Sequence, residues 1–233
     1  MLKNKYLTKI CLSLLALVFA TELFSFVIWA YTKIFFNRIE NNSITDADLS
    51  FFDWIERYGD KIDRFYALIS LLSLLFAIVY LVWLYKAHVN LSILGAKNLR
   101  YSHASVVWWW FIPIANLWKP YSAFKEVIIQ SQQLAFGSVQ STKFGVFLLI
   151  WWLLTFLTFP SLILGSIMIL GSIIREIGEL HTLNVYHFLL NAILVQYVFD
   201  ITLSILLFYL IYNVDKWQKK ANQSKPISLQ KSN

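Results

Sequence analysis

Long apolar runs, separated by shorter charged stretches, set the pattern of this 233-residue chain. Four of the runs reach or exceed the roughly 20 residues that a helix needs to cross the hydrocarbon core of a bilayer. They occupy residues 10–31, 65–86, 144–170 and 188–212. The first run follows three lysines, as in a secretory signal peptide, but its length favours an uncleaved helix. The pattern therefore predicts an all-α integral membrane protein with about four transmembrane helices.

A shorter apolar stretch, residues 105–118, interrupts this series. It is too short to span comfortably, and it contains Pro113 and Asn116. Apolar segments of this length more often re-enter a membrane or lie at its interface than cross it. We expect a half-length, proline-broken segment, which either lines a site as a re-entrant element or anchors the chain at the headgroups through its aromatic side chains.

Three polar or mixed segments differ from the spanning runs. Residues 119–136 place apolar side chains on one helical face, which predicts an amphipathic helix on the membrane surface. Residues 50–64 mix aromatic and charged side chains, as either a short interfacial helix or a solvated loop would. The tail, residues 216–233, carries five lysines among serine and glutamine, a composition typical of disorder. Residues 1–215 are expected to form a single transmembrane domain.

Basic residues set the expected orientation. The chain holds 20 lysines and arginines against 13 acidic residues, and the basic ones flank the apolar runs. This distribution is typical of membrane orientation signals and not of a nucleic-acid-binding face. With four spans, 14 basic residues share a side with both termini and six lie on the other, which predicts cytoplasmic termini. A five-span arrangement, with residues 105–118 crossing, divides them 13 to seven, and the proline-broken segment favours four.

Composition and motifs narrow the class of protein further. Hydrophobic residues make up 58% and charged residues 14% of the chain, too apolar for a soluble domain of this size. Cys11 is the single cysteine, so neither an intramolecular disulfide nor a cysteine metal cluster is possible. The sequence holds no Gly-x-Ser-x-Gly elbow, His-Glu-x-x-His, phosphate-binding loop or dinucleotide glycine pattern. We expect no catalytic residues, no cofactor and no metal.

Two carboxylates lie inside apolar runs, Glu22 near the middle of the first and Asp200 near the middle of the last. A charged side chain at the centre of a bilayer costs about 2.5 to 3.5 kcal/mol, so such residues face the bundle interior and often carry function. Gln196, Asp200 and Ser204 recur at helical spacing and share one face. The two carboxylates either form a proton or cation site or stay neutral and hold neighbouring helices together by hydrogen bonds.

Residues 83–131 carry the most specific motif of the chain. A tryptophan ends a spanning helix, an asparagine and a small-residue turn follow, and a tryptophan-rich segment leads to Phe-Ile-Pro, an asparagine and a second proline. The positions are Trp83, Asn90, Gly95, Trp110, Pro113, Asn116 and Pro120, with Trp118 and Tyr121 alongside. This arrangement resembles the bacterial membrane family called domain of unknown function 4328. One departure is that His103 and Ala104 follow Ser102, where the resemblance implies a serine-proline-glycine turn.

The resemblance implies a bacterial multi-span membrane protein and supplies neither a substrate nor a reaction. With the residues themselves, it predicts a non-catalytic component of the cytoplasmic membrane, a scaffold or regulator that binds partner proteins or a second copy of itself within the lipid bilayer. Nucleic acid is not expected as a partner. A small transporter or channel subunit that uses Glu22 and Asp200 is the alternative, and a lipid-active enzyme is the weaker one because the sequence offers no pair of nucleophile and base.

Overall fold

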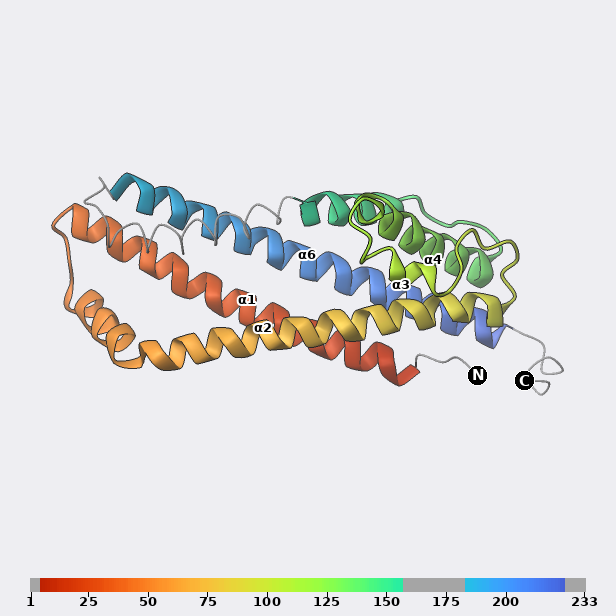
Figure 1. Cartoon of the computed structure of the whole chain (residues 1–233), viewed down its shortest axis with the longest axis horizontal. Coiled ribbons are helices and arrows are strands. Elements are labelled where there is room, and N and C mark those ends of the chain that lie inside the picture. Colours follow the sequence, from red (N-terminus) through yellow and green to blue (C-terminus); the bar gives the residue numbers. More distant parts are fainter. Residues whose placement is uncertain (1–4, 157–182, 225–233) are drawn as a thin grey trace. The chain divides into compact units, whose positions relative to one another are not determined.

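The computed structural model describes residues 5–156 and 183–224. In these residues the regular elements are helices, and no strand occurs. In chain order they are α1 (Lys5–Glu40), α2 (Asp46–Leu94), α3 (Ser105–Trp108), the 3-10 helix η1 (Ala115–Leu117), α4 (Lys119–Phe136), the helix Lys143–Phe156 and α6 (Leu183–Gln223) (Figure 1). The predicted all-helical class is confirmed for the described chain.

The helices α1, α2 and α6 are long and apolar enough to cross a membrane. They contain 36, 49 and 41 residues, well above the roughly 20 that a span requires. Of the most apolar window in each helix, only 22%, 17% and 17% is buried inside the protein. Most of the apolar surface of these windows is therefore left for another environment to cover. The three helices contain the first, second and last of the predicted runs.

The third predicted run, residues 144–170, is described only in part. Its first portion forms the apolar helix Lys143–Phe156, which by itself is shorter than a span. The rest of the run, including Pro160, lies outside the described residues. The count of four transmembrane helices thus stays a prediction, and three helices of spanning length are established.

The helices extend beyond the apolar runs that predicted them. Residues 50–64 are neither a separate interfacial helix nor a loop, because α2 is continuous from Asp46. At the other end of the chain, α6 continues to Gln223, so the predicted disordered tail begins too early at residue 216. Trp217 and Ala221 are buried there, and their packing gives this polar stretch a reason to stay helical.

The segment 105–118 is broken, as its proline and asparagine predict. It forms only the short α3 and η1, with turns between them. Pro113 has no amide hydrogen to donate and disfavours helical geometry in Ile112, so a regular helix does not continue through this point of the segment. The backbone amide of Asn116 closes the following turn by donating a hydrogen bond to the carbonyl oxygen of Ile112 at 2.7 Å.

The helix α4 has the bounds that the sequence predicts. Pro120 sits in its first turn, where a missing amide hydrogen costs nothing, and Gly137 ends it with φ of 77°, a left-handed conformation that glycine adopts readily. Its buried positions are Pro120, Ala123, Phe124, Val127, Ile128, Ser131, Gln132 and Ala135. This face is covered by protein, and the placement of the helix on the membrane surface stays a prediction. The amphipathic pattern records packing onto neighbouring helices.

The chain divides into two compact units. The first unit comprises Met1–Ala16, Leu74–Leu153 and Ser204–Asn233, and the second comprises Leu17–Ser73 and Leu154–Leu203. The three long helices each contribute a section to both units. Every contact described below lies within one unit or the other.

Aromatic side chains form the core of the first unit. Trp83 is completely buried, and its ring meets Phe124 of α4 edge to face, with centroids 6.1 Å apart. Tyr80 stacks on Trp83 and meets Trp110 edge to face at 5.8 Å. Trp110 in turn contacts Trp152 at 5.8 Å. The motif residues Trp83 and Trp110 are therefore joined, through Tyr80, in one aromatic cluster.

Replacing Trp83 with alanine should lower the free energy of unfolding by about 3 to 5 kcal/mol, because it empties a large volume in the aromatic core. Trp108 is the matched control, since its side chain is 64% exposed, and Trp108→Ala should change stability by no more than about 0.5 kcal/mol in detergent. Denaturation of the purified protein in mixed micelles, followed by circular dichroism, measures both. Equal losses in the two variants would contradict the assigned core.

Candidate functional site

Asn90 belongs to a buried hydrogen-bond network in the first unit. Its side-chain amide donates to Oε1 of Gln218 in α6 at 3.0 Å. The Gln218 amide nitrogen donates to the carbonyl oxygen of Ala87 at 2.9 Å and to the hydroxyl of Ser131 at 3.2 Å. Asn90, Ser131 and Gln218 are all fully buried. The predicted site residue Asn90 therefore helps to join α2, α4 and α6.

Trp83 takes part in a second polar contact. Its indole nitrogen donates to the hydroxyl of Thr8 at 3.1 Å, and that hydroxyl donates to Asp215 Oδ1 at 3.0 Å. Asp215 also forms an ion pair with Lys219, one turn further along α6. The beginning of α1, the end of α2 and the end of α6 are thereby connected through side chains.

Two histidines that the sequence analysis passed over lie in contact. The Nδ1 atoms of His88 and His103 are 2.6 Å apart. Nε2 of His88 lies 3.2 Å from Glu126 Oε2, and Nε2 of His103 lies 3.2 Å from the hydroxyl of Ser92. These contacts fix the donor and acceptor roles of neutral rings. Nε2 of His88 donates to Glu126, so Nδ1 of His88 accepts a hydrogen bond from Nδ1 of His103. Nε2 of His103 then accepts a hydrogen bond from the Ser92 hydroxyl.

Glu126 connects these histidines to the loop that follows α2. Its two carboxylate oxygens accept hydrogen bonds from the backbone amides of Arg100 at 2.5 Å and Tyr101 at 3.3 Å. A carboxylate in this position orders the loop and orients His88 at the same time. One hint was present in the sequence, since His88 and Ser92 are four residues apart on one helical face. Within residues 5–156 and 183–224, no group of three or more His, Cys, Asp or Glu side chains is arranged to hold a metal ion.

The broken segment presents an apolar surface around a half-buried centre. Trp110 is packed against the core, and Leu117 accepts a hydrogen bond from the indole nitrogen of Trp152 at 3.1 Å. In the described structure, the side-chain oxygen of Asn116 and the indole nitrogens of Trp109 and Trp110 are buried without hydrogen-bond partners. The large exposed side chains of the segment are Trp108, Phe111, Ile112, Ile114, Leu117 and Trp118. Such a concentration of exposed apolar side chains marks an interaction surface.

A lysine borders this apolar surface. Nζ of Lys119 lies 5.3 Å from the ring centroid of Trp109 and 5.7 Å from that of Tyr101. Aromatic rings next to lysine are the combination that settles at the level of lipid headgroups. Pro113 and Pro120 flank the turn that brings the chain from this surface into α4.

The two carboxylates of the apolar runs belong to the second unit. Asp200 is half-buried, and the amide nitrogen of Gln196 donates to its two oxygens at 2.9 Å and 3.0 Å. The spacing of Gln196 and Asp200 predicts a shared helical face, and this contact joins the two side chains. Glu22 lies half-buried on α1 in the same unit. The side chain of Tyr197, on α6, lies next to Ser25 and Trp29 of α1.

A third carboxylate, Asp48, lies at the start of α2 and is buried. It accepts hydrogen bonds from the Thr45 hydroxyl at 2.5 Å, the Thr45 amide at 2.9 Å, Arg38 at 2.8 Å and the Tyr31 hydroxyl at 3.1 Å. These hydrogen bonds lower the pKa of Asp48 to about 2, although burial opposes them. The Thr45 hydroxyl has the largest effect, and the Thr45 amide, Arg38 and Tyr31 follow. Thr45 and Asp48 have the spacing of a capping box, which the sequence analysis did not use.

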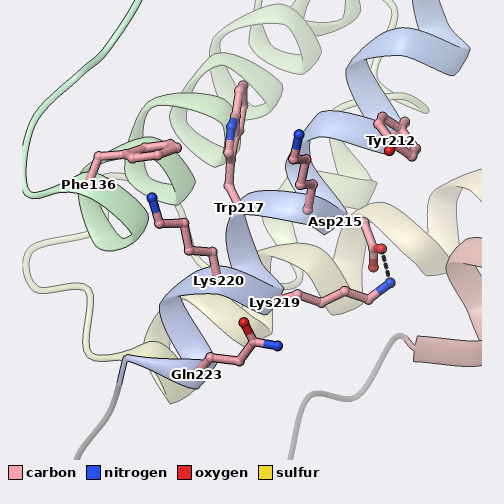
Figure 2. A pocket seen from close by; sticks show the side chains of 8 residues that line it. Phe136, Tyr212, Asp215, Trp217, Lys219, Lys220 and Gln223 are labelled. Atoms are coloured by element: carbon pink, nitrogen blue, oxygen red, sulfur yellow. Dashed lines mark ion pairs between the residues drawn. The ribbon is translucent and has the colours of Figure 1, made fainter.

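A surface cavity of about 440 Å3 lies against the last turns of α6 (Figure 2). Its lining residues are Phe136, Tyr212, Asp215, Lys216, Trp217, Lys219, Lys220 and Gln223. The figure shows Lys219 turned to Asp215, with which it is paired, and the amino group of Lys220 turned to the ring of Phe136. The sequence analysis placed these lysines in a disordered tail, so the cavity could not be foreseen.

Comparison with known proteins finds one family. A sequence profile described as "Domain of unknown function (DUF4328)" matches residues 47–216. No curated protein and no solved structure matches the chain. The matched region begins at the second residue of α2 and ends within α6, so it contains the two histidines, Glu126 and Asn90 but neither Thr8 nor Gln218.

Acid should weaken the contact between α1 and α2 through Asp48. Its folded pKa of about 2 is below the ordinary value of 3.8, so this carboxylate stabilises the fold above about pH 4 and loses that contribution as the pH falls towards 2. Asp48→Asn should therefore be less stable than the wild type at pH 6, and the difference should shrink between about pH 4 and pH 2. Thermal unfolding in detergent across this range measures it.

Asp46→Asn is the control for this effect, because Asp46 is exposed in the same first turn of α2. It should follow the wild-type profile. A difference between Asp48→Asn and wild type that stays constant from pH 6 to pH 2 would show that the carboxylate charge of Asp48 contributes nothing.

Proposed function

The chain belongs to the family described as domain of unknown function 4328, and we propose that it is a non-catalytic integral protein of the bacterial cytoplasmic membrane that binds partner proteins. The observation that carries the membrane location is the uncovered apolar surface of α1, α2 and α6. Each helix is of spanning length, yet no more than 22% of its most apolar window is buried inside the protein. A lipid bilayer is the environment that covers such surfaces.

The packing of the first unit supports an arrangement in which segment 105–118 does not cross. Trp83 lies on α2 before this segment, and Phe124 lies on α4 after it, yet the two rings are in contact. Because Trp110 also contacts Tyr80 of α2, the chain leaves and returns at the same level of the unit. The apolar side chains of the segment then serve as an anchor at the membrane interface.

The same unit gathers the basic segments that the charge distribution assigns to one side. Thr8 from the beginning of the chain, Trp83 from α2 and Asp215 from α6 are hydrogen-bonded in series. Residues 86–143 belong to the same unit. This grouping supports both termini lying on the side with more lysine and arginine, which is the cytoplasm in the positive-inside pattern.

A scaffold or regulator is the role that fits the polar groups of the described residues. The buried carboxylate, amide and imidazole groups of the first unit bond to one another and tie helices together, as the contacts of Gln218 and Glu126 illustrate. Such networks fix the arrangement of helices. The surfaces left for a partner are the acidic beginning of α2 and the basic side of the first unit.

Membrane extraction and cysteine labelling test this proposal together. The protein should remain in the membrane pellet after alkaline carbonate treatment. On a Cys11→Ser background, Ser43→Cys should react with a membrane-impermeant thiol reagent in intact cells, whereas Ser138→Cys and Ser224→Cys should react only after permeabilisation. All three positions are exposed in the structure, so lack of reaction reports the membrane barrier. Release by carbonate would refute the membrane location, and labelling of Ser138→Cys from outside would refute the orientation.

The second candidate is a transporter or channel subunit that uses Glu22 and Asp200. The observation that favours it is the position of Asp200, which is held by Gln196 within an apolar helix of spanning length. A carboxylate in that setting is a potential proton or cation site. The same contact serves equally to stabilise the helix, so the two roles call for different measurements.

Conservative and truncating substitutions separate the two roles of the carboxylates. Glu22→Gln with Asp200→Asn keeps size and hydrogen bonding but removes the charge, so a structural role predicts normal thermal stability in detergent. Glu22→Ala with Asp200→Ala should then lower it. An ion pathway predicts that the Gln and Asn variant is stable yet loses proton or cation flux in proteoliposomes. Asp53→Asn, an exposed carboxylate change on α2, is the control and should alter neither property.

A further inference from the structure

One face of the last turns of α6 forms the cavity described above. Tyr212, Lys216, Lys220 and Gln223 recur at intervals of three or four residues and therefore share this face. The neighbouring face carries Gln218 into the buried network with α2 and α4. These hydrogen bonds hold α6 against α2 and α4, so the lysine-bearing face that lines the cavity is held in place.

The cavity is positively charged. Three lysines and a single carboxylate, Asp215, are among its lining residues. Asp215 is paired with Lys219, so its charge is compensated within the wall. Lys216 is exposed, and Nζ of Lys220 lies 3.8 Å from the centroid of the Phe136 ring at the edge of the cavity. Two lysine charges in a concave, partly apolar setting favour an anion.

An apolar strip leads from the cavity along α6. Ile205, Phe208, Tyr209 and Tyr212 are 54%, 40%, 42% and 52% exposed, and their spacing places them in line with the lysines. The strip belongs to a helix of spanning length, and the lysines follow its last tyrosine by one turn. In such helices, tyrosine and then lysine mark the passage from acyl chains to headgroups.

We propose that this cavity binds the phosphate group of an anionic phospholipid, with Lys216 and Lys220 facing the phosphate and the acyl chains lying along the strip from Ile205 to Tyr212. The proposal rests on the membrane location put forward above. Lysine pairs with a phosphodiester through its charge, and clustered basic residues next to a span recognise anionic headgroups. Free phosphate offers the same charge, but it leaves the apolar strip unused, so a lipid accounts for both features.

Lipid binding to the full-length protein in detergent tests the proposal. Native mass spectrometry, with phosphatidylglycerol, phosphatidylcholine and inorganic phosphate as separate probes, gives the affinity for each. Wild-type protein should prefer phosphatidylglycerol. Lys216→Gln with Lys220→Gln should weaken phosphatidylglycerol binding by about 10- to 30-fold, because each lysine near a membrane surface contributes roughly a factor of five. Binding of phosphatidylcholine should not change.

Two matched variants serve as controls. Lys97→Gln with Lys143→Gln removes two exposed lysines of the first unit that do not line the cavity, and it should keep wild-type affinity. Lys216→Arg with Lys220→Arg keeps the charge and should also bind normally. The proposal would be overturned if Lys216→Gln with Lys220→Gln bound phosphatidylglycerol as tightly as Lys97→Gln with Lys143→Gln. Displacement of the lipid by inorganic phosphate at a comparable concentration would also overturn it.

The membrane location is judged separately from this site. Carbonate treatment of the same variants reports whether the chain is embedded in the membrane, and that result does not depend on lysine in the cavity. Protein that stays in the pellet but shows no preference for phosphatidylglycerol would overturn the lipid site alone. Protein released by carbonate would overturn the proposed function and this site with it.

Discussion

The carboxamide of Gln218 is fully buried, and its two polar atoms bond to Ala87, Asn90 and Ser131. A buried amide that loses such partners costs about 1 to 3 kcal/mol, so these bonds restrict how α2, α4 and α6 can slide past one another. Apolar side chains tolerate small shifts in register, whereas a hydrogen bond does not. The aromatic cluster around the fully buried Trp83 and Phe124 fills the core of the first unit, and the Gln218 contacts fix which residues face each other. The cavity on α6 depends on the same register, because its lysines share a helix with Gln218.

Sequence reasoning was most successful where a local rule decides the outcome. The bounds of α4 follow from Pro120 at one end and Gly137 at the other, and the break near Pro113 follows from the chemistry of proline. It was less successful at the ends of the long helices α2 and α6. An apolar run measures how much helix a bilayer can cover, and α2 and α6 continue through polar residues beyond that length.

The candidate sites show a similar division. Gln196 and Asp200 share the helical face that their spacing predicts, and the contact between them is local. By contrast, Asn90 meets Gln218 across 128 residues, and His88 meets Glu126 across 38, and no periodicity along the chain encodes such distances. The packing partners of α4 were not foreseen for a related reason, because an amphipathic pattern reveals an apolar face without identifying what covers it.

The thiol of Cys11 adds a consequence of the packing around α1. The side chain is completely buried, four residues before Leu15 on the same inward face. A sulfur atom in this position reacts with an alkylating reagent only while the helix is displaced, so the reaction rate reports how often the first unit opens. The alkylation rate of Cys11 therefore measures how often this unit opens locally, and its values in different detergents and lipids would show how strongly each environment holds the helices together.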